Sequence, residues 1–219
     1  MSGRLRVLLA DDHVLVAEGL GKLLREQFEL AGQVGDGRAL LEAAAALQPD
    51  VVVTDVAMPL LNGIDALREL ARTSPRTRVV VVTMHASPHM AAEAVRAGAS
   101  GYVLKHSAGD ELLQAVREVS AGRVYITPLI ARDLLSTLAE APAPRASRLT
   151  PRQRQVLQLV AEGHTMKQVA AHLGVSRRTA ESHKYQIMAL LGLHSTAELV
   201  QYAIRIGLVQ VDAPPAPGE

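Results

Sequence analysis

The first half of the chain carries polar side chains that would support metal or phosphoryl chemistry if they were brought together. They are three carboxylates, one hydroxyl and one ammonium: Asp11, Asp12, Asp55, Thr83 and Lys105. Carboxylates placed close together repel each other unless a cation compensates. A hard divalent ion such as Mg²⁺ is bound by one or two carboxylates together with waters and phosphate oxygens. Asp11 and Asp12 would supply such a site, with Asp55 beside the ion.

An ionised aspartate can also act as a nucleophile and form an aspartyl-phosphate, and Asp55 is the candidate. The metal ion and Lys105 would then neutralise the charge that builds on the transferring phosphoryl oxygens. The product adds roughly −1.5 to −2 charges, and Thr83 could donate a hydrogen bond to it. Inward movement of Thr83 would leave room for Tyr102 to change rotamer, which would couple a local charge to a nearby surface.

Each candidate lies at or just past the end of a predicted buried strand. Short apolar runs predict strands at 5–10, 30–34, 51–54, 79–83 and 101–105. Helical spacing of apolar residues predicts helices within 14–24, 39–47, 64–71, 90–97 and 112–119. This alternation predicts an α/β fold, a doubly wound parallel sheet of five strands with helices on both faces. The carboxyl ends of parallel strands meet at one edge, so we expect the five side chains to converge there. Taken singly, Asp55 could be only a turn former, and Asp11 or Asp12 only a helix cap.

Composition limits the class of protein. The chain has 219 residues, of which 2% are aromatic. It has no cysteine, which excludes disulfides and thiolate metal sites. There is no signal-peptide pattern and no apolar run of membrane-spanning length, so we expect a soluble cytoplasmic protein. Residues 1–122 hold 12 basic against 15 acidic side chains, whereas residues 123–219 hold 11 against 7. The basic second half weakly favours an anion as its partner, although an ordinary solvated surface would look the same.

A change of composition divides the chain. We expect a first domain over residues 1–122, followed by a linker helix and a Pro/Ala-rich tether within 123–147. The second domain would span 148–211, and the Pro/Ala-rich end, 212–219, is typical of a disordered tail. Surface or supporting roles are favoured over metal binding for four histidines of the first domain, because their spacing is not that of a metal motif. These are His13, His85, His89 and His106.

The pattern of the second domain predicts a small all-α unit of four helices. Thr150, Thr165, Ser176 and Thr196 mark the four helix starts, and Gly174 marks a tight turn between the second and third. Two short helices joined by such a turn form a helix-turn-helix, whose second helix enters the major groove of DNA.

The candidate DNA-contacting residues lie on or near the third helix of this unit. Basic side chains would contact phosphates, Glu181 could accept from cytosine, and Ser182 or Tyr185 could contact base edges. The full set is Lys167, Arg177, Arg178, Thr179, Glu181, Ser182, His183, Lys184 and Tyr185. A helical protein-interaction domain remains an alternative on spacing alone.

The first domain resembles the receiver domain of two-component response regulators, which has a flavodoxin-like fold. The resemblance rests on Asp11-Asp12, Asp55 with Met58-Pro59 and Gly63, Thr83, and Gly101–Lys105. It implies that Asp55 accepts a phosphoryl group from a histidine kinase. It also implies Mg²⁺ bound by Asp12, Asp55 and the backbone carbonyl of Ala57, with Thr83 and Tyr102 as a switch pair.

The second domain is similar to the LuxR-type DNA-binding domain. The similarity rests on Leu149–Leu157, Val169–Ser176 and Thr179–Lys184. Together the two resemblances give the architecture of the NarL/FixJ group. They imply a phosphorylation-controlled transcription factor that binds promoter DNA, forms a homodimer when phosphorylated or DNA-bound, and has no membrane partner.

Two other functions use the same residues. One is an Asp-nucleophile phosphatase of the haloacid-dehalogenase type, which needs a second acid two residues after the nucleophile. Ala57 occupies that position, which argues against an enzyme. The other is a constitutive DNA binder whose first domain only dimerises, and it would take up no phosphate from acetyl phosphate and Mg²⁺.

Overall fold

The computed structural model describes residues 4–139 and 149–209. The chain divides into two compact units, Met1–Ala143 and Pro144–Glu219. The predicted tether, 141–147, and the predicted tail, 212–219, lie outside the described residues. The domain boundary expected at 147/148 also falls at that gap, so it remains a prediction.

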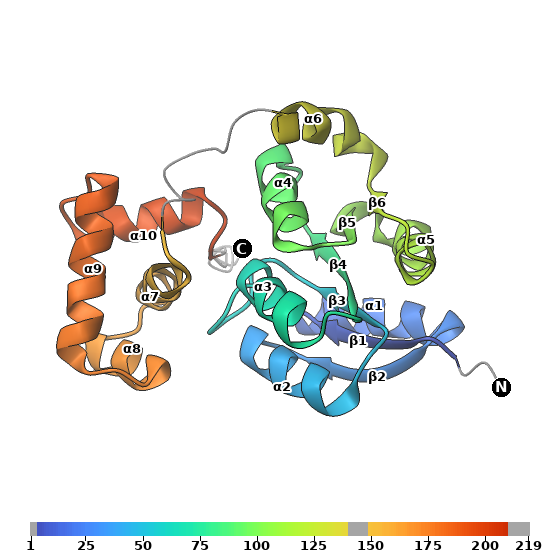
Figure 1. Ribbon diagram of the computed structural model, residues 1–219, viewed down its shortest axis with the longest axis horizontal. Coiled ribbons are helices and arrows are strands. Elements are labelled where there is room, and N and C mark those ends of the chain that lie inside the picture. The colour runs from blue at the N-terminus through green and yellow to red at the C-terminus, as the bar shows by residue number, and fades with distance from the viewer. Residues whose placement is uncertain (1–3, 140–148, 210–219) are drawn as a thin grey trace, which may run out of the picture. The chain divides into compact units, whose positions relative to one another are not determined.

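A parallel sheet flanked by helices forms the first unit (Figure 1). The strands are β1 (Arg6–Ala10), β2 (Glu29–Val34), β3 (Val51–Thr54), β4 (Arg78–Thr83), β5 (Gly101–Leu104) and β6 (Tyr125–Ile126). Their order across the sheet is β2-β1-β3-β4-β5-β6, and every pairing is parallel. The chain starts at β1, one strand in from the β2 edge, and winds first to that edge and then across the sheet in the other direction, which is the predicted doubly wound α/β fold.

Helices cover both faces of this sheet. They are α1 (Val14–Gln27), α2 (Gly37–Leu47), α3 (Gly63–Thr73), α4 (Pro88–Ala97), α5 (Ala108–Ser120) and α6 (Pro128–Ala139), with a short 3₁₀ turn η1 (Lys105–Ser107) before α5. Alternate strand residues face opposite cores: Leu8 and Val52 pack with α2, α3 and α4, whereas Val7 and Val53 pack with α1 and α5. Because both faces are covered, the interiors of the central strands are continuous apolar runs, as the sequence indicated.

The prediction of five strands was wrong. A sixth strand, β6, pairs with β5 through Gly101↔Tyr125 and Tyr102↔Ile126. It lies in the segment assigned to the linker, and two residues are too few to give a periodic signal. The helix predicted after it is confirmed as α6, and its Ile130 and Leu134 are buried in the same core as the alanines of α4.

The second unit is helical in its described residues. Its helices are α7 (Pro151–Ala161), α8 (Met166–Leu173), α9 (Arg177–Leu191) and α10 (Thr196–Arg205). Thr150 and Thr165 each form a reciprocal capping box, and Ser176 caps α9, which confirms these predicted starts. α10 is capped by Ser195, with Thr196 as its first residue. Gly174 ends α8 with φ 62°, a left-handed conformation that turns the chain into α9.

Candidate functional site

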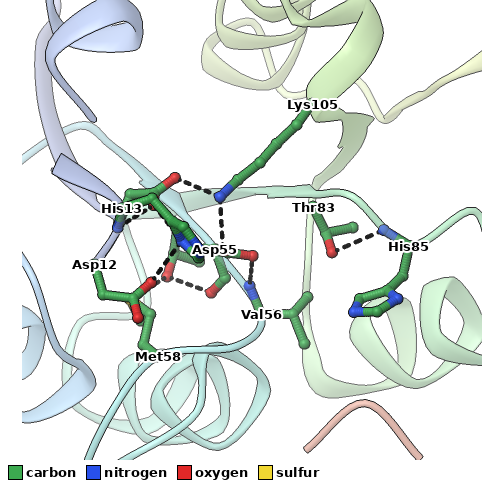
Figure 2. Close-up of polar contacts among 10 residues, drawn as sticks. Asp12, His13, Asp55, Val56, Met58, Thr83, His85 and Lys105 are labelled. Carbon is green, nitrogen blue, oxygen red and sulfur yellow. Dashed lines mark hydrogen bonds and ion pairs between the residues drawn. The ribbon is translucent and has the colours of Figure 1, made fainter. Parts of the chain in front are cut away.

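The carboxyl edge of the sheet gathers the predicted pocket residues (Figure 2). Asp11 follows β1, Asp55 follows β3, and Lys105 follows β5. The Nζ of Lys105 lies 2.7 Å from Asp11 Oδ2 and 2.7 Å from Asp55 Oδ2. The side chains of Lys105, Asp11 and Asp55 are only 5%, 1% and 0% exposed. One ammonium therefore bridges two buried carboxylates from different strands.

The loop after β3 is shaped to present Asp55. The Asp55 N–H donates to the Ala10 carbonyl at 2.9 Å, which fixes its backbone beside β1. The Val56 N–H donates to Asp55 Oδ1 at 2.5 Å and holds one carboxylate oxygen. A Cβ on Gly63 would lie 1.9 Å from the Asp55 carbonyl oxygen, so only glycine lets α3 begin this close.

Burial and charge set the protonation of these groups. Burial, helped by the charge of Asp11, raises the pKa of the Asp55 carboxyl above its ordinary value, although Lys105 opposes this shift. Burial alone would lower the pKa of Lys105, but Asp55 and Asp11 outweigh it and raise the pKa of the ammonium. Lys105 is thus a fixed cation beside a carboxylate whose charge is costly to bury.

The donor atoms fit a hard divalent cation. One ligand atom from each of Asp11, Asp12, His13 and Asp55 can be chosen so that all lie within 4.8 Å of one another. Asp12 is the exposed member, while Asp11 and Asp55 are buried. Ala57, whose carbonyl the receiver resemblance adds, is buried in the loop between β3 and α3. Carboxylate oxygens with room for waters are the set that Mg²⁺ prefers.

Sequence reasoning missed how closely His13 approaches this group. Its Nδ1 lies 3.0 Å from Asp12 Oδ1 and 3.4 Å from Asp11 Oδ1. Within the described residues Nδ1 is nevertheless shielded from solvent and has no hydrogen-bond partner, so these short distances are not hydrogen bonds. The His13 N–H donates to Asp11 Oδ1 at 2.9 Å. Its adjacency to the acidic pair was the available signal, and the supporting role expected for it stays a prediction.

Thr83 and Tyr102 meet at the backbone of His85. The Tyr102 hydroxyl donates to the His85 carbonyl at 2.9 Å, and the His85 N–H donates to Thr83 Oγ1 at 3.2 Å. Thr83 and Tyr102 are fully buried. Burial, with a smaller effect of Asp55, raises the pKa of the Tyr102 phenol, so it stays a hydrogen-bond donor. Tyr102 therefore points inward and holds the loop between β4 and α4.

In the second unit, α9 buries one side and exposes the other. Ala180, Ile187 and Leu191 are buried, and their spacing defines the inner face. Arg178, Ser182 and Tyr185 lie about half a turn away and are exposed, Tyr185 by 66%. Because α9 follows α8 and the turn at Gly174, it corresponds to the recognition helix of a helix-turn-helix, and this stripe is its exposed face.

Not every predicted DNA-contacting side chain is equally available. Arg177 Nε donates to Glu181 Oε1 at 2.8 Å, and Lys184 Nζ donates to Thr196 Oγ1 at 2.7 Å. His183 is half-buried, with Nδ1 shielded from solvent. Thr179, at the start of α9, and Lys167, at the start of α8, are exposed. Arg178, Ser182 and Tyr185 thus form an exposed stripe along α9, whereas Arg177 and Lys184 are engaged in contacts within the unit.

Comparison with known proteins agrees with both units. Residues 7–117 match the response regulator receiver domain, and residues 147–203 match the luxR family of bacterial regulatory proteins. The transcriptional regulatory protein MctR of Rhizobium johnstonii is 36% identical over 208 residues, covering 94% of this chain and 96% of MctR. The response regulator GacA of Pseudomonas aeruginosa is 35% identical over 209 residues, covering 94% and 98%.

Among solved structures, a Salmonella typhimurium RcsB response regulator matches with a TM-score of 0.67 at 27% identity, covering 95% of this chain and 100% of RcsB. A receiver domain followed by a LuxR-type DNA-binding domain defines a two-component response regulator that regulates transcription. This chain belongs to that family, in its NarL/FixJ type.

Within the described residues no single helix is long and apolar enough to cross a bilayer; only α9 and α10 taken together, bent by 69°, pass that test.

Proposed function

We propose that Asp55 accepts a phosphoryl group from a histidine kinase, with Mg²⁺ bound, and that phosphorylation controls DNA binding by the second domain. The observation that carries the proposal is the double contact of Lys105 with Asp55 and Asp11, at 2.7 Å each. A buried carboxylate with a fixed cation beside it is ready for an incoming phosphoryl group, whose negative oxygens need such a partner. Ala57 offers no acid for hydrolysis, which favours a receiver over an Asp-nucleophile phosphatase.

Mg²⁺ would be held by Asp12, Asp55 and the carbonyl of Ala57, with Asp11 beside it. When bound, the ion supplies positive charge to the phosphoryl oxygens. Lys105 would move from the Asp55 carboxylate to the phosphoryl group, while Thr83 would turn its hydroxyl from the His85 N–H toward a phosphoryl oxygen. Tyr102 already points inward, so the proposal does not need the rotamer change expected from the sequence. Its hydroxyl would stay bonded to the His85 carbonyl and hold the β4–α4 loop after Thr83 has turned.

The second domain would bind promoter DNA through α9, as a homodimer. One solved relative is RcsB of Salmonella enterica serovar Typhimurium bound to promoter P1flhDC in the presence of the phosphomimetic BeF3-, with a TM-score of 0.64 at 29% identity. Another holds two RcsB dimers on two parallel DNAs, with a TM-score of 0.58 at 27% identity. Since its partners would be a kinase and chromosomal DNA, we expect the protein to act in the cytoplasm.

The acceptor is tested by incubating the full chain with acetyl phosphate and Mg²⁺ and measuring the intact mass. We expect the wild type to gain one acid-labile phosphoryl group and Asp55→Asn to gain none, because an amide oxygen is a poor nucleophile. Asp110→Asn, an exposed aspartate at the start of α5, is the matched control and should label like the wild type.

The proposal fails if Asp55→Asn is still labelled, or if the wild type is never labelled but binds DNA fully. The second result would favour the constitutive DNA binder. A wild type that binds promoter fragments more tightly after labelling, with Asp55→Asn unchanged, would support control by phosphorylation.

A further inference from the structure

Thr127 is a buried polar residue outside the pocket that joins three elements. It lies between β6 and α6, and only 2% of it is exposed. The pocket chemistry does not use it, and it lies in the segment assigned by sequence to the linker. Strand β6, which directly precedes Thr127, pairs with β5, the strand that carries Tyr102 (Figure 1).

Each polar group of Thr127 is paired. Its N–H donates to the Tyr102 carbonyl at 2.9 Å, and its carbonyl accepts from the Ile130 N–H at 3.2 Å. Its hydroxyl donates to Glu111 Oε2 at 2.8 Å and accepts from the Leu104 N–H at 3.3 Å. A hydroxyl has one hydrogen to donate, so these two roles are distinct. Thr127 thereby connects β5, α5 and the first turn of α6.

The backbone groups that Thr127 holds belong to the functional end of β5. Tyr102 carries the inward phenol, and Leu104 directly precedes Lys105. The end of β5 is therefore fixed on one side by the ion pairs of Lys105 and on the other side by Thr127. Strand β6 adds only two residues of pairing, so the Thr127 side chain supplies contacts that the short ladder lacks.

At the other side of Thr127, α6 is held against α4. Ile130 and Leu134 are buried in the core that includes Ala91 and Ala94 of α4. Arg96, in the last turn of α4, donates from Nη2 to the Thr137 carbonyl at 3.3 Å. Helix α6 is thus attached to α4 along its length and to β5 through Thr127 at its start. The contacts of α6 are therefore placed where they would respond to a shift of β5 or α4.

We infer that Thr127 is a positioning residue that couples the phosphorylated pocket to α6, the last described helix before the second domain. The inference rests on the proposed function of Asp55. When Lys105 leaves Asp55 for the phosphoryl group, the end of β5 is pulled, and the hydroxyl of Thr127 passes that displacement to the start of α6. Without the hydroxyl, β5 and α6 respond independently.

The test compares Thr127→Val, which keeps the shape but removes the hydroxyl, with Thr127→Ser, which keeps the hydroxyl. Hydrogen–deuterium exchange of residues 128–139 is measured in the full chain with and without acetyl phosphate and Mg²⁺. Phosphoryl uptake is measured by mass on the same samples. In the wild type and in Thr127→Ser, we expect phosphorylation to change the exchange of α6.

In Thr127→Val we expect uptake to persist and α6 to exchange about tenfold faster in both states, because buried donors and acceptors lose their partner. The ratio of the α6 exchange rates with and without phosphorylation should then fall to about one, as expected for uncoupled elements. A purely structural role would speed exchange in both states but preserve their ratio. If Thr127→Val does not fold, Glu111→Ala is used instead. Glu111, half-buried on α5, accepts the hydrogen bond of the Thr127 hydroxyl, and the variant is judged by the same ratio of α6 exchange rates.

The outcomes separate the two proposals. If Thr127→Val takes up phosphate and keeps the wild-type ratio of α6 exchange rates, the coupling is overturned but the proposal that Asp55 is the acceptor stands. The same follows from a wild type whose α6 exchange is unchanged by phosphorylation, or from a Thr127→Ser that loses the response as fully as Thr127→Val. A wild type that takes up no phosphate overturns the proposed function, and the coupling falls with it.

Discussion

The receiver pocket and the recognition helix use charge in opposite ways. In the pocket, Lys105 bridges Asp11 and Asp55, and all three side chains are almost completely buried. On α9, the Arg177–Glu181 ion pair is 72% and 36% exposed, and Arg178 lies open to solvent. Buried charges interact strongly and are little screened, whereas exposed pairs contribute about 0–1 kcal/mol and are weakened by salt.

This difference matches the two proposed partners. A phosphoryl group must meet charges that the fold already holds beside the acceptor, because its transfer is stabilised by preorganised groups that need only small local movements. DNA is a long polyanion, and solvated side chains bind it reversibly by displacing its counterions. The buried site therefore depends on fixed geometry and the exposed one on net charge, so substitutions in the two regions should differ in size and in their response to salt.

The largest expected effect is that of Lys105→Met on stability. Removing the cation that pairs with both Asp11 and Asp55 leaves two buried carboxylates facing each other. We expect the free energy of unfolding to fall by about 3–5 kcal/mol, the cost of breaking a buried ion pair. Urea unfolding would measure it, at low and at high salt, and the loss should be nearly independent of salt.

Lys22→Met, at an exposed position of α1, is the control and should change stability by about 0.5 kcal/mol or less. Equal effects of the two variants, or a Lys105 effect that vanishes in salt, would show that the pocket charges behave like surface charges.

A smaller effect is expected from Arg178→Ala on DNA binding. Loss of one phosphate contact should weaken binding about tenfold on two duplexes of unrelated sequence and reduce the slope of log K against log salt by about 1. Fluorescence anisotropy over a salt series would measure both quantities. The fold should be unaffected, because Arg178 is exposed.

Arg205→Ala, which removes an exposed arginine from α10, is the matched control for charge. An unchanged slope in Arg178→Ala, or the same loss in Arg205→Ala, would place the DNA-binding surface away from the exposed stripe of α9.

The smallest effect concerns the pH dependence of stability in Asp55→Asn. The pKa of Asp55 is raised from its ordinary value of 3.8, chiefly by burial. The folded state then binds the proton more tightly than the unfolded state, so the stability contributed by Asp55 is complete below 3.8 and is lost as pH rises through the folded pKa. Asparagine does not titrate, so this loss is absent in the variant.

We therefore expect the difference in unfolding free energy, Asp55→Asn minus wild type, to increase as pH rises from about 4 toward neutrality. Urea unfolding across that range measures it, without Mg²⁺, which would bind the wild type and mask the effect. Asp110→Asn should show no such trend. A difference that stays flat or shrinks with pH would mean that Lys105 outweighs burial at Asp55.

Much of this arrangement was predictable because it follows local rules. Four of the five predicted pocket residues stand at strand ends, and parallel topology brings such ends to one edge whatever the loops do. Helix starts at Thr150, Thr165 and Ser176 were predictable because a capping side chain bonds only to neighbouring backbone. Strand β6 was not, since its two residues are ordered by pairing with β5.

Apart from β6, the sequence alone determined the type and order of the main strands and helices, the candidate pocket residues and the exposed stripe of α9, because apolar periodicity and caps act within a few residues of each other. Only the tertiary structure decided that Lys105 contacts both carboxylates, that His13 stands beside them, that Lys184 is turned to Thr196, and that Thr127 ties β5 to α6. Those contacts join residues distant along the chain or depend on side-chain rotamers. Their distances and directions are set when the elements pack together, and no local pattern in the sequence records them.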